Sequence, residues 1–391
     1  MELCGRRADT GQPLRVAFHA GRISRVEPAA PAGAADWPWI APGLMDIQVN
    51  GYGGQEFASA TLTVARAAEV IRTFARFGVA RLCPTLTTES FDVLRHACAT
   101  LARLCESDAE LARRIVGLHL EGPYITPEDG ARGAHPRAHC RPPDWAEFCR
   151  LQDAAGGRIR IVTLSPEYEG SLDFIRRAVQ SGVTVALGHM SATPEQVKAA
   201  VEAGARLSTH LGNGSHPYLH RFRNYLWTQL AEERLAASLI VDGHHLPPDV
   251  VKVFVRCKTP QRCILVSDLS GQAGQPPGRY SSRFCDVEIL PDGSLVVAGQ
   301  RELMAGASLP LHHSVGNVMA YAGVDLATAL RMASDNPAAL LGIEPGALAP
   351  GRPADLIQFR LLAPAAGTAV PRMEIVRTVW EGRVVWEGPG A

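Results

Sequence analysis

The stretch "VTVALGHMSATPEQVKAAVEAGARLSTHL", Val183 to Leu211, contains a complete strand–helix–strand unit. Its first five residues are apolar or β-branched, as in a buried strand. Thr193 supplies a helix N-cap, Pro194 suits the first helical position, and Gln196 completes a capping box. The helix is expected to end at Gly204, because glycine commonly terminates helices. A second apolar segment follows, so the unit predicts two parallel strands joined by a helix.

Apolar segments of the same kind recur along the middle of the chain. They lie at residues 43–49, 79–86, 114–120, 159–164, 183–188, 206–211, 237–242 and 262–267. Helical patterns separate them, and eight such strands in succession favour an α/β fold of the (β/α)₈ barrel type. A doubly wound parallel sheet remains the alternative on this pattern alone.

The two ends of the chain differ from the middle. They contain short alternating apolar pieces separated by glycine and proline, which is typical of β-hairpins. Neither end is long enough to build a core alone. We therefore expect one small β-sandwich domain formed jointly by residues 1–40 and 346–391, beside a barrel at residues 41–345.

Composition narrows the class of protein. The 391 residues are 46% hydrophobic and 20% charged, which is typical of a globular protein. Net charge is zero without a dense basic run, which argues against nucleic-acid and membrane-surface partners. The nine cysteines form no Cys-x-x-Cys pair, and their odd number argues against a disulfide framework. No signal-peptide core or membrane-length apolar run is present, so we expect a cytoplasmic protein.

Polar side chains stand where the predicted strands end, which is where the reactive groups of parallel barrels gather. These residues are Gln48, Asn50, Glu121, His189, His210, Asp242 and Asp268. Two histidines and a carboxylate at one barrel mouth match a catalytic zinc site with three protein ligands. A second carboxylate, Asp268, could accept a proton from the metal's water and pass it to a leaving group. Each of these side chains could instead be structural, as a hydrogen-bonded histidine or as a carboxylate that caps the next helix.

Eight segments occur in an order that is typical of one enzyme family. They are "PGLMDIQVNGYGG", "GLHLEGPYI", "LGHMSAT", "STHLGN", "VDGHHL", "LVSD", "MAGAS" and "DNPAALLGIEPGALAPGRPADLIQF". In this order they resemble the N-acetylglucosamine-6-phosphate deacetylases of the amidohydrolase superfamily, from about Ile40 to Val384. The resemblance implies a metal-bearing barrel and a small β domain from both termini. The implied reaction removes acetyl from N-acetylglucosamine-6-phosphate, giving glucosamine-6-phosphate and acetate.

The resemblance also implies catalytic roles. Glu121, His189 and His210 would hold one divalent metal per chain, for which Zn²⁺ is the first choice. Asp268 would act as general base and then general acid. His135, in the segment "GARGAHP", would stabilise the oxyanion that forms on the acyl group.

The first strand departs from many amidohydrolases, which carry His-x-His there to help bind a second metal. This chain has Gln48 and Asn50 at those places, and neutral amides are poor zinc ligands beside imidazole. One branch of the deacetylase family looks the same and uses a single metal. The resemblance therefore assigns both amides to hydrogen bonds near the metal's water.

The resemblance further implies a set of substrate contacts. They are His245, Asn213, Gly214 and Arg221, together with the amides Gln48 and Asn50. His244 could replace His245 after a small change of register, and Arg223 lies close to Arg221. The family's arginine reaches across a homodimer interface to the sugar phosphate, for which a guanidinium is well suited.

The substrate loops leave other functions open. The family usually reads "THLYNAM" where this chain reads "THLGNGSHPYLHRFRN", and "DLSGQAGQPPGRY" follows the strand at 262–267. The substrate could therefore be a non-phosphorylated amino sugar or an N-acyl amino acid. A dihydroorotase-like hydrolase is a further alternative, although its relatives usually carry His-x-His. A sugar-binding protein without catalysis is disfavoured, because a binder needs no general base beside a metal.

Overall fold

The computed structural model describes the whole chain except residues 31–35, 282–285, 366, 368 and 390–391. Within the described residues, eight parallel strands form the central sheet. They are β5 Leu44–Val49, β8 Val79–Thr87, β9 Leu118–Glu121, β10 Ile159–Leu164, β11 Thr184–Leu187, β12 Leu207–Ser208, β13 Ala236–Ile240 and β14 Cys263–Val266. Each of the eight predicted segments overlaps one of these strands, although β8 and β9 end one residue later and β13 begins one residue earlier than predicted. The prediction was wrong for the start of the third, since Ala109–Arg114 forms a helix and the strand begins at Leu118.

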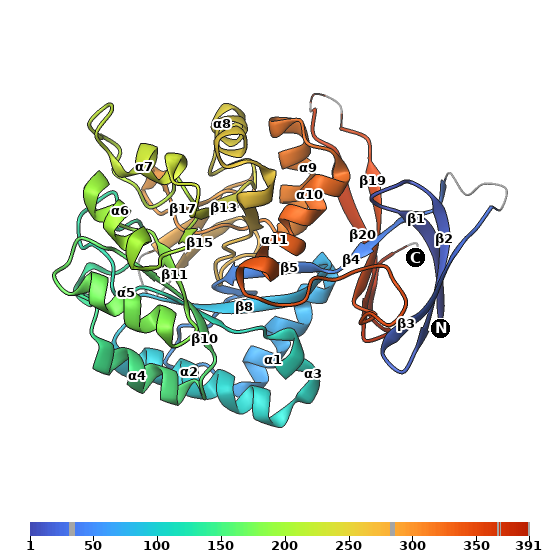
Figure 1. Cartoon of the computed structure of the whole chain (residues 1–391), viewed down its shortest axis with the longest axis horizontal. Helices are drawn as coiled ribbons and strands as arrows, with labels where there is room; N and C mark the ends of the chain where they lie inside the picture. Colours follow the sequence, from blue (N-terminus) through green and yellow to red (C-terminus); the bar gives the residue numbers. More distant parts are fainter. Residues whose placement is uncertain (31–35, 282–285, 366, 368, 390–391) are drawn as a thin grey trace.

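The sheet closes into a barrel where its first and last strands meet. The amide of Asp268 donates to the carbonyl of Gln48 at 2.9 Å, and the amide of Ser267 donates to Asp46 Oδ1 at 3.2 Å. Val49 and Leu269 add a parallel bridge. These contacts confirm the (β/α)₈ barrel and exclude the doubly wound sheet (Figure 1).

Helices surround the barrel strands. They are α1 Val64–Thr73, α2 Phe91–Ser107, α3 Ala109–Arg114, α4 Trp145–Ala154, α5 Ser171–Gln180, α6 Pro194–Ala203, α7 Tyr225–Ala231, α8 Pro248–Lys258, α9 Leu311–Ala322, α10 Leu326–Met332 and α11 Asp335–Leu340. Helix α6 confirms the predicted capping box of Thr193 and Gln196 and ends at Gly204. None of the helices in the described part of the chain has the length and apolar character needed to cross a membrane.

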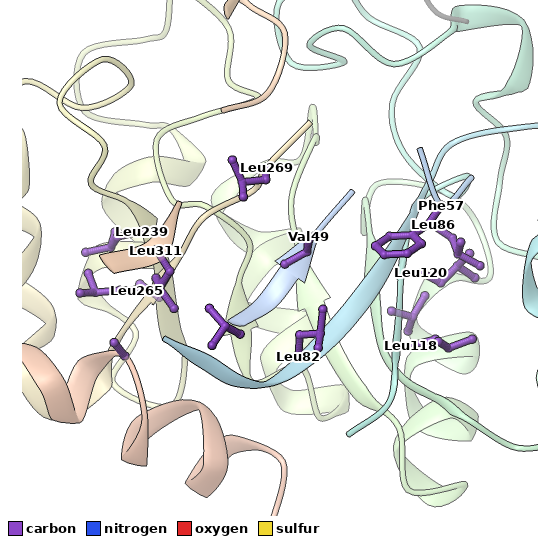
Figure 2. Close-up of a cluster of buried hydrophobic side chains, with 14 of the residues drawn as sticks. Val49, Phe57, Leu82, Leu86, Leu118, Leu120, Leu239, Leu265, Leu269 and Leu311 are labelled. Atoms are coloured by element: carbon purple, nitrogen blue, oxygen red, sulfur yellow. The ribbon is translucent and has the colours of Figure 1, made fainter. Parts of the chain in front are cut away.

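The main hydrophobic core lies between the strands and this ring of helices. Figure 2 shows part of it, including Val49, Leu82, Leu120 and Leu265, all of which are fully buried. Burying one such side chain contributes about 1.5–3 kcal/mol, so this layer holds the strand ends in place. A second cluster, with Ile161 among its members, fills the barrel interior.

Both termini build the small domain. Its described strands are β1 Glu2–Arg7, β2 Pro13–His19, β3 Arg22–Pro28, β4 Trp39–Pro42, β19 Leu356–Leu362, β20 Arg372–Trp380 and β21 Arg383–Glu387. They follow the order β21-β20-β19-β4-β1-β2-β3 in one sheet, and strands from both of its halves share a core. Gly382, in the turn after β20, lies against Phe18 of β2, so the sheet folds back on itself as expected of a small sandwich. We propose domain boundaries at residues 40/41 and 345/346, the first of which falls within β4.

Four short strands that were not predicted follow β14. They are β15 Gly278–Ser281, β16 Asp286–Ile289, β17 Leu295–Val297 and β18 Gln300–Met304, and they form an antiparallel sheet among the described residues. The sheet lies between the last barrel strand and α9 in the sequence. A two-stranded hairpin, β6 Gly51–Tyr52 with β7 Gln55–Glu56, follows the first barrel strand.

Candidate metal centre and active site

Glu121, His189 and His210 converge at the carboxyl ends of the barrel strands. Glu121 Oε1 lies 2.9 Å from His210 Nε2 and 3.3 Å from His189 Nε2, and the two histidine nitrogens are 3.1 Å apart. All three side chains are buried. One ligand atom from each residue therefore points at a common centre.

These donors fit a divalent cation. The Nδ1–H of His189 donates to the carbonyl of Ala131 at 3.0 Å, which turns Nε2 towards the centre, where its lone pair could bind a cation in place of a proton. Burial alone would raise the pKa of Glu121, but hydrogen bonds from His189 and His210 hold that pKa well below its usual value. A carboxylate and two imidazole nitrogens are ligands that suit zinc, and three protein ligands leave a position for water.

The backbone at the strand ends is held in an uncommon conformation. His189, His210 and Asp268 have positive φ angles of 50°, 28° and 52°. Such angles cost a non-glycine residue about 1–3 kcal/mol and tend to occur at functional sites. The His210 amide is secured by the hydroxyl of Ser238 at 2.7 Å, which directs the imidazole into the barrel mouth.

Asp268 lies beside the proposed ligands and is also buried. Asn50 Nδ2 donates to Asp268 Oδ1 at 2.8 Å, and Gln48 Nε2 donates to Glu121 Oε1 at 2.8 Å. The two amides therefore bind the site's carboxylates. Burial and the charge of Glu121 raise the pKa of Asp268 to about 8.

A cavity of about 290 Å³ opens above this group. Its lining includes His135, Asn213, Gly214 and His245, as well as Asp268. The unpredicted sheet β15–β18 covers part of the mouth. Val287 of β16 and residues 302–306 at the end of β18 contribute to the wall. The sequence pattern did not reveal this wall, because β18 is short and largely exposed.

Two cavity histidines have well-defined surroundings. The ring of His135 lies 4.3 Å from that of His189, and burial together with His189 lowers the pKa of His135 to about 3. His245 Nδ1 lies 2.8 Å from Asp242 Oδ2, and Asp242 Oδ1 accepts the amides of His244 and His245. His245 lines the cavity, whereas His244 is not among its lining residues.

The predicted phosphate ligand lies outside this group. Arg221 and Arg223 are exposed and belong to the loop before α7. Among the described residues that line the cavity, none is a lysine or an arginine. The chain therefore does not bring Arg221 together with the other predicted residues.

Four buried polar residues beneath the site were not predicted from the sequence, namely His119, Asp46, Thr163 and Thr209. His119 Nε2 lies 2.7 Å from Thr163 Oγ1, and burial lowers the pKa of His119 to about 4, so the ring is neutral. Strand alternation places residues 119 and 121 on one face, and this pattern could have identified His119.

Comparisons with known proteins agree with this geometry. The family model described as "Amidohydrolase family" matches residues 39–385. An N-acetylgalactosamine-6-phosphate deacetylase of Escherichia coli O157:H7 is 33% identical over 88% of this chain and 89% of its own. An N-acetylglucosamine-6-phosphate deacetylase of Homo sapiens is 32% identical over 90% of this chain and 84% of its own.

A solved structure also resembles this chain over its whole length. The crystal structure of N-acetyl-D-glucosamine-6-phosphate deacetylase from Mycobacterium smegmatis superposes with a TM-score of 0.86. It is 29% identical, and the match covers 99% of this chain and 100% of that one. The chain is thus a hydrolase of carbon–nitrogen bonds that belongs to the amidohydrolase family and, within it, to the group that contains the N-acetylglucosamine-6-phosphate deacetylases.

Proposed function

We propose that this enzyme removes the acetyl group from N-acetylglucosamine-6-phosphate, giving glucosamine-6-phosphate and acetate. The observation that carries the proposal is the buried group of Glu121, His189 and His210 beside Asp268, at the floor of a cavity large enough for a sugar. The names of the relatives support an amino-sugar phosphate as the substrate.

The metal would supply positive charge in this scheme. A divalent cation held by Glu121, His189 and His210, with Zn²⁺ as first choice, would polarise the acetyl carbonyl and lower the pKa of a bound water. The positive charge would also lower the pKa of Asp268, so that its carboxylate is available at neutral pH.

Proton transfer is assigned to Asp268. Asn50 occupies Oδ1, which leaves Oδ2 to take the proton of the water that attacks the acetyl carbon. Asp268 then returns this proton to the sugar nitrogen as the carbon–nitrogen bond breaks. His135 is neutral and lines the cavity beside His189, where its ring can donate a hydrogen bond to the acetyl oxygen as negative charge develops.

We assign the substrate contacts to His245, Asn213 and Gly214, with Gln48 and Asn50 as supports for the site's carboxylates. The cavity lining described above holds no lysine or arginine, so the phosphate needs a cation from elsewhere. We propose a homodimer in which Arg221 of a second copy supplies it. Tyr218 and Phe222 of the same loop expose 92% and 77% of their surface, which suits a contact between protein copies.

We also place the enzyme in the cytoplasm. The eight cysteines that the structure describes all carry free thiols. Free thiols are typical of a reducing compartment.

Two alternatives for the substrate have specific support. The relative from Escherichia coli O157:H7 carries the name of the galactosamine enzyme, which favours N-acetylgalactosamine-6-phosphate. The cavity lining carries carboxylates such as Glu56 and Glu302 but, among the described residues, no lysine or arginine, which favours an amino sugar without phosphate or another small N-acyl compound.

Acetate release from both sugar phosphates and from N-acetylglucosamine separates these cases. We expect fastest turnover of N-acetylglucosamine-6-phosphate. Arg221→Ala should raise KM for that substrate at least about tenfold, as expected for loss of a charged hydrogen bond. It should not change KM for the sugar without phosphate, and Arg223→Ala should change neither. Turnover of N-acetylglucosamine alone, with Arg221→Ala unchanged, would contradict the phosphate assignment.

A further inference from the structure

A chain of side-chain hydrogen bonds crosses the barrel one layer below the proposed ligands. His119 Nδ1 lies 3.0 Å from the carbonyl oxygen of Ile47, and His119 Nε2 lies 2.7 Å from Thr163 Oγ1. Thr163 Oγ1 in turn lies 2.8 Å from Thr209 Oγ1. We call His119, Thr163 and Thr209 the interior brace. None of the three exposes more than 2% of its surface.

The direction of these bonds is fixed by their first member. The carbonyl of Ile47 can only accept, so His119 carries its proton on Nδ1. Nε2 of the neutral ring then accepts from the hydroxyl of Thr163, which accepts from Thr209. The brace is therefore a single ordered sequence of donors and acceptors.

The brace joins strands that are not neighbours in the sheet. The bond from His119 to Ile47 links β9 to β5 across β8, and the bond from Thr163 to Thr209 links β10 to the residue that follows β12, across β11. Backbone ladders connect only adjacent strands, so they cannot fix these distances. The arc from β5 to β12 carries Gln48 and all three proposed ligands.

The position next to His189 is adapted to the brace. A Cβ atom on Gly188 would lie 2.9 Å from Thr209 Cβ and 3.1 Å from Thr163 Cγ2. A side chain at residue 188 would therefore press on the two threonines. The backbone that carries one ligand passes directly over the bond between Thr163 and Thr209.

Two of the three brace residues also stand close to a ligand in the sequence. His119 precedes Glu121 by two residues on the same face of β9, and Thr209 precedes His210 directly. We propose that the interior brace is a positioning element, which sets the spacing of Glu121, His189 and His210 and thereby the affinity for the metal. This inference rests on the proposed metal site. Groups that orient metal ligands typically change metal affinity 10–100-fold when they are removed.

Two substitutions at Thr163 separate positioning from simple packing. Thr163→Val keeps the shape but breaks both bonds of the hydroxyl, whereas Thr163→Ser keeps the hydroxyl and removes a methyl group. Thr378→Val is the matched control, because Thr378 is fully buried in the small domain and its hydroxyl donates to the carbonyl of Ala75 at 2.7 Å. Zn²⁺ affinity is measured on the full-length apoprotein by competition with a chelator, together with the absorption spectrum of the Co²⁺-loaded form and thermal unfolding of the apoprotein.

We expect Thr163→Val to weaken Zn²⁺ binding about 10–100-fold and to change the Co²⁺ spectrum. Thr163→Ser should stay within about threefold of wild type by the same reasoning. Thr378→Val should bind Zn²⁺ normally while losing as much thermal stability as Thr163→Val. If Thr163→Val does not fold, Thr209→Val gives the same test with a smaller expected loss, because it removes only the last bond.

Unchanged Zn²⁺ affinity in Thr163→Val, or in Thr209→Val if it is used instead, would overturn the inference. Equal weakening in Thr163→Val and Thr163→Ser would also overturn it, since packing and not hydrogen bonding would then matter. A wild-type protein that bound no metal would overturn the proposed metal site and the inference together. The affinities thus distinguish failure of the brace from failure of the proposed function.

Discussion

Gln48 and Asn50 show how the residue types of the first strand suit a site with one metal. Each side chain donates an amide hydrogen to a carboxylate, Glu121 in one case and Asp268 in the other. Neither amide ionises, so both carboxylates are oriented without an additional charge. The sequence identified the uncommon residues, but only the structure gave their partners.

Asp46 provides a prediction at the residue scale. Its carboxylate is fully buried, accepts the amides of Gln48 and Ser267 through Oδ1, and leaves Oδ2 without a hydrogen-bond partner among the described residues. Burial raises its pKa to about 7 from an ordinary value of 3.8. Between these values the folded protein binds the extra proton, so the stability from this group is complete below pH 3.8 and is lost as the pH rises through 7.

We predict that Asp46→Asn removes this loss, because an amide keeps the acceptor oxygen and does not ionise. The free energy of unfolding of the variant, relative to wild type, should rise by about 1.4 kcal/mol for each pH unit from pH 5 to the folded pKa of about 7, and then change little up to pH 8. Urea unfolding of both metal-free proteins at the two pH values measures it. A difference that does not depend on pH would show that Asp46 ionises normally.

At the scale of elements, the loop after β12 is fitted closely around a ligand. Gly214 has φ +56°, and a Cβ there would lie 2.5 Å from His189 Nδ1. Gly157 has a similar φ of +75° but open space around it. These two glycines therefore share the backbone requirement and differ only in the contact.

We predict that Gly214→Ala displaces the ring of His189 and lowers both Zn²⁺ affinity and kcat at least about tenfold. Both substitutions should cost about 1–2 kcal/mol of stability, because both positions have left-handed backbone. Gly157→Ala should leave metal binding and kcat unchanged. Chelator competition and steady-state kinetics test the pair. Equal activity in both variants would mean that the loop yields without moving His189.

Sequence periodicity predicted the barrel because buried parallel strands are continuous apolar segments and their helices carry recognisable caps, as in α6. It failed for β15–β18, which are short and mostly exposed, and for the start of β9, where helix α3 precedes the strand. The strand-end rule grouped Glu121, His189, His210 and Asp268 correctly in space. It could not give the positive φ angles of His189, His210 and Asp268, which depend on contacts with distant residues, such as the hydrogen bond that the His210 amide donates to Ser238.

At the scale of the whole molecule, a buried ion pair joins the two domains. Arg81 of β8 and Asp355, next to β19, lie 2.9 Å apart, and the Asp355 side chain is only 7% exposed. Its second oxygen accepts the amide of Glu381 at 3.0 Å. The ion pair thus links the small domain to the start of strand β8, at the end of the strand away from the catalytic carboxylates.

We predict that Asp355→Ala lowers the free energy of unfolding by about 3 kcal/mol, because it leaves Arg81 without its buried partner. The kcat at 25 °C should stay at the wild-type value. Asp9→Ala, which removes an exposed pair with Arg7, should cost no more than about 1 kcal/mol. Urea unfolding with parallel assays checks both variants, and a large loss of kcat in Asp355→Ala would show that the small domain shapes the active site.

The central claim is that one metal, held by Glu121, His189 and His210, works with Asp268 to hydrolyse an N-acetyl group. The most direct test is acetate release from N-acetylglucosamine-6-phosphate while Zn²⁺ is titrated into metal-free enzyme, for wild type and Asp268→Asn. We predict that wild-type activity rises to a plateau at one metal per chain. Asp268→Asn should bind the same amount of metal with kcat reduced by about 10²–10⁴. Activity that needs two metals, that needs none, or that survives in Asp268→Asn would contradict the claim.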